Sequence, residues 1–107
     1  MSELAARHCA ALEGHAAMTE IEIAEHLQEA DAWSYSAGAI EKTYRFADYH
    51  RTMAFVNAVA WIAHREDHHP EIAFGYNRCT VRFNTHSVGG ISVNDFICAA
   101  KVDALGA

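Results

Sequence analysis

The sequence predicts an α+β two-layer sandwich, in which helices pack on one face of a four-stranded antiparallel sheet. Three observations carry this prediction. Capping-box motifs mark the starts of helices, two pairs of segments alternate between apolar and polar residues, and a short turn joins the members of each pair. The expected order is helix, two strands, helix, two strands, helix, and strands joined by a short turn pair antiparallel.

Length and charge limit the class of protein. The chain has 107 residues, 51% of them hydrophobic, which is the size of one domain with a single core over residues 1–107. Its net charge is −6, without a basic stripe to neutralise phosphates, so direct binding of nucleic acid is not expected. The sequence shows no signal peptide and no apolar stretch long enough to cross a bilayer, so we expect a cytoplasmic protein without membrane attachment.

The cysteines argue against two kinds of site. Cys9, Cys79 and Cys98 are odd in number and lack C-x-x-C spacing, which disfavours both a disulfide framework and a cysteine-based zinc site. Reduced thiols are therefore expected.

The first half of the chain predicts a helix and a hairpin. Residues 1–17 are alanine-rich without a clear breaker, and they fit either a helix or a loosely attached arm. Thr19 and Glu22 have capping-box spacing and predict a helix over about residues 20–30. Residues 33–35 and 39–46 predict two strands joined across residues 36–38. In the second strand one face carries Ile40, Lys42, Tyr44 and Phe46, and the other carries Glu41, Thr43 and Arg45.

A long central helix should follow. Asp48 can cap a helix that runs to about Glu66, and Pro70 disfavours helical geometry at His69, so the helix must end at the adjacent histidines. Three polar residues recur every seven positions and are expected to be solvated: His50, Asn57 and His64. The expected apolar stripe consists of Met53, Val56, Ala60 and Ala63, widened by Phe55, Val59 and Ile62.

The rest of the chain predicts a second hairpin and a last helix. The alternating residues Ile72, Phe74 and Tyr76 predict one strand, and Cys79, Val81 and Phe83 predict the other, with a tight turn at Asn77-Arg78. After Gly89-Gly90, Ser92 and Asp95 have capping-box spacing, while Ile91 and Phe96 can form a hydrophobic staple. The last helix should run to about Leu105.

Four residues are candidates for proton-transfer chemistry. His68 and His69 are the only adjacent histidines, and imidazoles suit proton transfer at neutral pH, although a surface pair at a helix end is an alternative. His86 lies at a strand end, where either a functional or a solvated histidine is common. Asp95 fits the third position of a capped helix and can also serve a site. Zinc binding through His64, His68 and His86 is a further alternative, but no fourth ligand is evident.

Three separated segments carry a resemblance to a known family. The segments EDHHPEI, YN and THSVGGISVNDF together resemble the pterin-4a-carbinolamine dehydratase family, which joins a His-His-Pro-Glu run, a Tyr-Asn turn and a Thr-His segment leading to Gly, Ser and Asp. The spacings of seventeen residues from His69 to His86 and nine from His86 to Asp95 also resemble the family's. The resemblance extends more loosely through YRFADYHRTMAFVNAVA to Trp33, and it covers roughly residues 33–104.

The resemblance implies a hydro-lyase. Its expected reaction converts 4a-hydroxytetrahydropterin to quinonoid dihydropterin and water, which recycles tetrahydrobiopterin for an aromatic amino acid hydroxylase. Family active-site residues fall on His68, His69, His86 and Asp95. This chemistry needs a proton donor at the leaving oxygen and an acceptor for the ring-nitrogen proton, so no metal or redox cofactor is expected. We expect His68 and His86 to exchange protons, His69 to hold the pterin, and Asp95 to orient a histidine and favour its cationic form.

The resemblance also leaves an alternative and a departure. Family members in animals stabilise the dimer of a transcription factor, so a protein-binding module is the alternative function. The family forms dimers and tetramers, and unpaired edge strands offer a route to assembly, so a homodimer or homotetramer is expected. Where many members have Trp after Pro-Glu, this chain has Ile72, which could alter the pocket wall. Glu71 is expected to be a solvated acid at the start of a strand.

Overall fold

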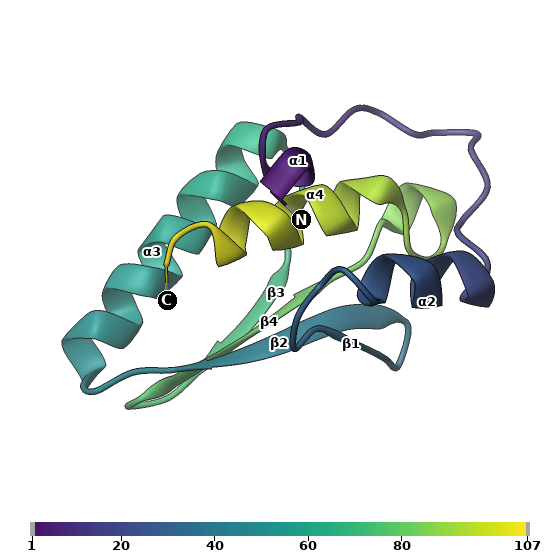
Figure 1. Ribbon diagram of the computed structural model, residues 1–107. Helices are drawn as coiled ribbons and strands as arrows, with labels where there is room; N and C mark the ends of the chain where they lie inside the picture. The colour runs from purple at the N-terminus through teal and green to yellow at the C-terminus, as the bar shows by residue number, and fades with distance from the viewer. Residues whose placement is uncertain (1, 107) are drawn as a thin grey trace.

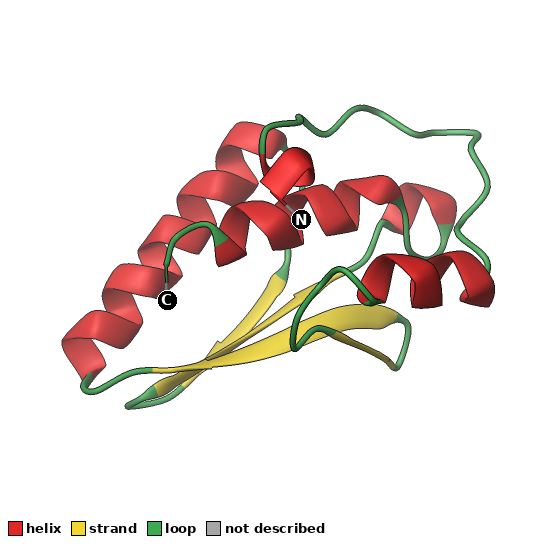
Figure 2. Cartoon of the chain, in the orientation of Figure 1, coloured by secondary structure: helices red, strands yellow, loops and turns green. Residues whose placement is uncertain are grey.

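The computed structural model describes residues 2–106 and confirms the α+β fold class. Figures 1 and 2 show the helices gathered on one face of a single sheet. The elements are α1 (Ser2–Ala5), α2 (Glu20–Leu27), β1 (Ser34–Ser36), β2 (Ala39–Arg45), α3 (Tyr49–Glu66), β3 (Glu71–Phe74), β4 (Arg78–Phe83), a 3₁₀ helix η1 (His86–Val88) and α4 (Val93–Asp103).

The sheet joins the two predicted hairpins through their second strands. Its order is β1-β2-β4-β3, and all three neighbouring pairs are antiparallel. In the central pair Ile40 lies opposite Phe83 and Lys42 lies opposite Val81. This register turns the apolar residues of both strands toward the same face, the one that the helices cover (Figure 1).

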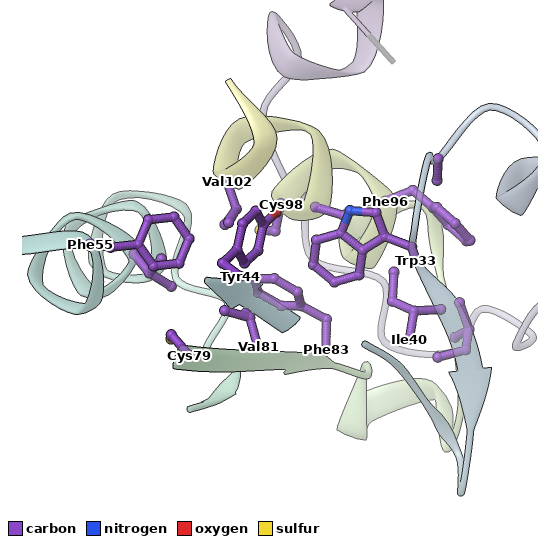
Figure 3. Close-up of a cluster of buried hydrophobic side chains, with 14 of the residues drawn as sticks. Trp33, Ile40, Tyr44, Phe55, Cys79, Val81, Phe83, Phe96, Cys98 and Val102 are labelled. Atoms are coloured by element: carbon purple, nitrogen blue, oxygen red, sulfur yellow. The ribbon is translucent and has the colours of Figure 1, made fainter. Parts of the chain in front are cut away.

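The core lies between this sheet face and α4. Figure 3 shows Ile40, Tyr44, Val81 and Phe83 from the sheet pointing toward residues of α4 such as Phe96. These side chains are buried, as are most residues of α4. An antiparallel sheet that is covered on one side needs a polar opposite face. Here that face carries an ion pair between Glu41 and Arg82 at 3.3 Å and paired hydroxyls of Thr43 and Thr80 at 2.7 Å.

The central helix α3 begins and ends where predicted, but the set of residues that it buries differs from the predicted apolar stripe. Asp48 accepts a hydrogen bond from the Arg51 N–H at 2.8 Å, which confirms the N-cap. The expected positions of His50, Asn57 and His64 are confirmed, since all three are exposed. The prediction that Ala60 lies in the apolar stripe is wrong, because the stripe is rotated so that position 60 faces solvent. Its buried residues are Thr52, Phe55, Val59 and Ala63.

The exposure of Ala60 follows from the contacts of its neighbours in α3. The Thr52 hydroxyl is buried, and its single proton is shared between the carbonyls of Asp48 and Tyr76, both at 2.9 Å. Phe55 stacks against Tyr44 and Phe46 of the sheet at ring-centroid distances of 4.6 and 5.0 Å. These contacts set the rotation of the helix, and Ala60 then lies on its solvent side.

The second hairpin turns earlier than predicted. The turn comprises residues 75–77, and Arg78 is already the first residue of β4, so a turn at Asn77-Arg78 is wrong. Tyr76 is consequently an exposed turn residue and not part of the strand. In this turn the Arg78 guanidinium lies over Gly75, with Nη1 1.9 Å from the point that a Cβ at Gly75 would occupy.

Both capping boxes are confirmed. Thr19 and Glu22 exchange hydrogen bonds at the start of α2, and Ser92 and Asp95 do so at the start of α4. The staple residues Ile91 and Phe96 are both buried. The two helices end earlier than expected, at Leu27 and Asp103, and short turns follow each of them.

The segment before α2 is attached to the rest of the chain. The short helix α1 packs beside α4, and the following segment runs along the helical layer to the start of α2 (Figure 1). Its backbone is held at Cys9, Ala10 and Met18 by hydrogen bonds to distant residues. Within residues 2–106, no helix is both long enough and apolar enough to cross a membrane.

Candidate functional site

The end of α3 places His68. Asp67 adopts a left-handed conformation with φ of 49°, which ends the helix and turns the chain back. The His68 N–H then donates to the Ala63 carbonyl at 3.1 Å. Its imidazole stacks on Phe83 of β4, with a centroid distance of 6.0 Å and an interplanar angle of 6°. The ring is therefore held by both the helix end and the sheet.

A buried carboxylate faces this imidazole. Asp95 has no solvent exposure, and its Oδ1 lies 2.6 Å from Nε2 of His68. Its Oδ2 accepts hydrogen bonds from the Ser92 N–H at 2.9 Å and from the Thr85 hydroxyl at 2.8 Å. Asp95 thus caps α4 and contacts a histidine at the same time. A carboxylate oxygen can only accept a hydrogen bond, so Asp95 in its carboxylate form pairs with a proton on Nε2 of His68.

Two hydroxyl groups complete the support of Asp95. The hydroxyls of Thr85 and Ser92 lie 2.6 Å apart, and both residues are buried. The Ser92 oxygen also accepts from the Asn94 N–H at 3.2 Å. Since the Thr85 proton points to Asp95, the Ser92 proton is the one shared between the two hydroxyls. This chain of donors holds the carboxylate in one orientation.

The His68 side chain borders a cavity of about 360 Å³. One side of the cavity comes from the end of α3, from η1 with the preceding Thr85, and from the start of α4, and the other side comes from the segment that precedes α2. A cavity of this size falls in the range of small-molecule sites. It is lined by residues 9–13, residues 66–68, Thr85, Ser87 and Asn94.

The other two candidate histidines are adjacent in the sequence to residues that line the cavity, but both are exposed. His69 is the next residue after His68 and precedes Pro70, and His86 begins η1 directly after Thr85. Neither histidine is among the residues that line the cavity. Ile72 is half-buried against the core and does not line the cavity either. Glu71 is exposed, as expected. The structure therefore joins His68 with Asp95 and leaves His69 and His86 facing solvent.

The cavity includes residues that the sequence did not single out. Glu66 accepts from the Cys9 N–H at 2.7 Å and lies 2.9 Å from the His8 ring and 3.7 Å from the Lys101 ammonium. Burial alone would raise the pKa of Glu66, but these donors outweigh it and lower the pKa. On α4, the Asn94 side chain likewise binds the segment before α2, through hydrogen bonds with the backbone N–H and carbonyl of Ala10. No periodicity marks such contacts, because they join residues far apart in the chain.

Metal ligands were an alternative for the histidines. Among residues 2–106, no group of three or more His, Cys, Asp or Glu side chains is placed to hold a metal ion. His64 is exposed on α3 and stacks on Trp61 with a centroid distance of 5.5 Å. The titratable groups that do meet are an imidazole and a carboxylate, and this pair suits the transfer of protons.

The fold and the site define a small α+β domain with a carboxylate-supported histidine at a cavity. The sequence profile described as pterin 4 alpha carbinolamine dehydratase matches residues 16–105. A relative from Nitrosospira multiformis, named for this dehydratase, is 50% identical over 106 residues, covering 98% of this chain and 94% of its own. One from Stenotrophomonas maltophilia, named likewise, is 59% identical over 88 residues, covering 80% and 76%. The chain belongs to the pterin-4a-carbinolamine dehydratase family.

Solved structures show the same fold. A crystal structure from Brucella melitensis, described as a transcriptional coactivator/pterin dehydratase, has a TM-score of 0.80 and 33% identity, covering 85% of this chain and 99% of its own. A second structure is described as a pterin dehydratase-like protein that is a RuBisCO assembly factor in the alpha-carboxysome. It has a TM-score of 0.57 and 26% identity, covering 68% of this chain and 84% of its own.

Proposed function

We propose that the protein catalyses the dehydration of 4a-hydroxytetrahydropterin to quinonoid dihydropterin and water. The observation that carries this proposal is the contact of 2.6 Å between His68 and the buried Asp95 at the edge of a cavity. Membership of the dehydratase family supports the same reaction. The reaction removes the hydroxyl group from C4a and a proton from N5, so it requires an acid and a base.

His68 is the first catalytic residue in this proposal. Its Nε2 is occupied by Asp95, which leaves Nδ1 as the nitrogen that can exchange a proton with the substrate. The Asp95 carboxylate fixes the ring and stabilises the positive charge that forms when Nδ1 takes up a proton. Asp95 is thus a positioning residue that acts through His68.

His86 and His69 have complementary roles in the proposal. A second proton-transfer group is needed because the oxygen and the ring nitrogen change protonation in the same reaction. His86 lies between Thr85 and Ser87, which both line the cavity, and its exposed side chain is the candidate for this second group. His69 is adjacent to His68 and contributes to holding the pterin ring.

The decisive experiment measures the decay of 4a-hydroxytetrahydropterin that a hydroxylase generates in situ. The protein should accelerate the decay, and His68→Ala should lower kcat/KM by about 10²- to 10⁴-fold, as expected for loss of a general acid or base. His50→Ala is the matched control, because His50 is an exposed residue of the same helix α3. Full activity in a triple variant lacking His68, His69 and His86 would refute the proposed mechanism.

The physiological setting follows from the reaction. Quinonoid dihydropterin is the species that a reductase returns to the tetrahydropterin, so the protein would serve tetrahydrobiopterin recycling for an aromatic amino acid hydroxylase. If the intact protein does not accelerate the decay, the alternative of a protein-binding module becomes the preferred function. The description of the Brucella melitensis structure as a coactivator names such a role for that protein.

We also propose that the protein forms a homo-oligomer. The edge strand β3 is short and mostly exposed, and an unpaired strand edge can pair with another chain. The large apolar side chains of Trp61 and Tyr76 are 60% and 64% exposed, which favours a further contact surface. Light scattering coupled to size-exclusion chromatography at micromolar protein tests this proposal, and a monomer mass would contradict it.

A further inference from the structure

One wall of the cavity lies outside the region that matches the family. The profile begins at residue 16, whereas residues 9–13 form the side of the cavity that faces His68 and the end of α3. Three of these five residues are the apolar Ala10, Ala11 and Leu12, and Glu13 adds a carboxylate. The part of the chain that is least expected to belong to the site therefore contributes a large share of its lining.

This wall is held by two side chains close in the sequence to His68 and Asp95. The Asn94 amide makes two hydrogen bonds to Ala10, accepting from its N–H at 3.2 Å and donating to its carbonyl at 2.7 Å. Glu66 accepts from the N–H of Cys9 at 2.7 Å. Asn94 immediately precedes Asp95 on α4, and Glu66 is two residues before His68. The same two helix ends thus carry the proton-transfer pair and the supports of the wall.

Asn94 is buried, and its side-chain amide is used for binding the backbone of Ala10. Its side chain lies in the first turn of α4 and only 6% of the residue is exposed. Both polar groups of its amide are used by Ala10, so the amide forms a matched pair with one peptide unit of the segment. A purely structural cap of α4 would not need it, since Ser92 and Asp95 already cap that helix.

We propose that residues 9–13 form a working wall of the substrate cavity and that Asn94 is the positioning residue that holds this wall against the bound pterin. This inference rests on the proposed function for the identity of the ligand. The wall covers the substrate and excludes water without reaching the atoms that exchange protons. Loss of the wall should therefore weaken binding and leave the chemical step nearly intact.

The cysteines offer a way to restore the wall after it has been released. The Sγ atoms of Cys9 and Cys98 lie 3.5 Å apart, with Cys9 on the wall and Cys98 buried in α4. The azo compound diamide can oxidise this pair: the two thiols lose two protons and two electrons to form a disulfide, and diamide takes them up to become a hydrazine. The new bond would tie residue 9 to α4 without Asn94. Cys79 is buried in β4, on a different element from the pair, so peptide mapping should find it outside the disulfide.

The experiment compares four samples: the wild type, Asn94→Ala, Asn94→Ala after diamide treatment, and Asn94→Ala with Cys9→Ser after the same treatment. Each is assayed for kcat and KM, and for the dissociation constant of a stable 7,8-dihydropterin measured by fluorescence quenching. Asn94→Ala should raise KM and the dissociation constant about tenfold, the size expected for losing hydrogen bonds to one peptide unit, with kcat within about twofold. Oxidation should restore both constants only when Cys9 is present.

Peptide mapping identifies the disulfide, and alkylation of Cys9 by iodoacetamide in reduced samples reports release of the wall. Unchanged dihydropterin affinity in a variant whose Cys9 alkylates faster would overturn the inference. So would a fall in kcat that the verified Cys9–Cys98 disulfide does not repair, because Asn94 would then act through the geometry of α4. If the wild type does not accelerate dehydration, the proposed function fails, and dihydropterin binding alone decides the role of the wall. Absence of any dihydropterin binding by the wild type would overturn this inference too.

Discussion

The Asp95 carboxylate uses one oxygen for His68 and the other for the first turn of its own helix. Oδ1 lies 2.6 Å from Nε2 of His68, while Oδ2 accepts from the Ser92 N–H at 2.9 Å. A single buried side chain therefore links the end of α3 to the start of α4. Any change at Asp95 acts on helix capping and on the histidine together, and the experiments must separate the two effects.

The first prediction concerns Asp95→Asn. The amide keeps the shape of the carboxylate, but its NH2 group cannot accept a hydrogen bond. Either His68 or the first turn of α4 therefore loses its acceptor. We expect kcat/KM in the dehydration assay to fall by about 10²- to 10⁴-fold. Asp48→Asn is the control, because it changes the N-cap of α3 at the far end of that helix. A normal pH–rate profile in Asp95→Asn would contradict the role given to Asp95.

The second prediction concerns the hydroxyl of Thr85. This buried group donates to Asp95 at 2.8 Å and lies 2.6 Å from the Ser92 hydroxyl. Thr85→Val keeps the volume and leaves two buried partners without one hydrogen bond, so the free energy of unfolding should fall by about 1–3 kcal/mol. Urea denaturation measures this change. Thr85→Ser retains the hydroxyl, and a loss as large as that of Thr85→Val would point to the methyl group instead.

The third prediction concerns the polar cluster at the other end of α4. The Asp103 carboxylate accepts from Trp33 Nε1 at 3.0 Å, from Lys42 Nζ at 2.9 Å and from the Tyr44 hydroxyl. Asp103→Ala leaves these donors without their acceptor, and we expect a loss of about 2–3 kcal/mol in the free energy of unfolding. Asp31→Ala, at an exposed turn residue, should change it little. Equal stability of the two variants by urea denaturation would contradict the prediction.

The fourth prediction concerns pH and the attachment of Cys9. The pKa of Glu66 is lowered from its ordinary value of 4.5, because the Cys9 N–H, His8 and Lys101 together outweigh the effect of burial. A lowered pKa in the folded state means that the support from this carboxylate is complete above pH 4.5 and is lost as the pH falls through the lower folded value. The amide proton shift of Cys9 in NMR spectra should therefore titrate with a midpoint below 4.5.

Glu66→Gln provides the control for this titration. The glutamine side chain does not ionise, so the Cys9 amide shift should lose the acidic transition while the rest of the spectrum still responds to pH. A transition that persists in Glu66→Gln would assign the titration to another group. A midpoint at or above 4.5 in the wild type would contradict the lowered pKa.

Local signals explain the parts of the fold that the sequence predicted. Thr19 with Glu22, and Ser92 with Asp95, are three residues apart, so each capping box can be recognised without knowing the fold. The position of the turn before β4 was not predicted, because it depends on the register in which Phe74 of β3 pairs with Cys79 of β4. Asn77-Arg78 has a suitable turn composition, but composition does not report this register.

The candidate site also combines residues that local motifs indicate with contacts that only the fold reveals. The motif around His68 and the helix start at Asp95 were evident, although their contact spans 27 residues and needed the fold to be seen. The pairing of Asn94 with Ala10 spans 84 residues and has no periodic pattern, so nothing in the sequence marked it. A segment that is alanine-rich and irregular gives no sign of where it docks until the partners on α3 and α4 are in place.

The two sides of the cavity differ in how they would open. His68 is hydrogen-bonded to the last turn of α3 and stacks on Phe83 of the core, and Asp95 belongs to the buried first turn of α4, so this side is part of the core packing. The side formed by residues 9–13 depends on a few hydrogen bonds and can detach while the core remains folded. On the proposed function, warming the protein should therefore weaken its binding of the pterin at a lower temperature than it lowers kcat.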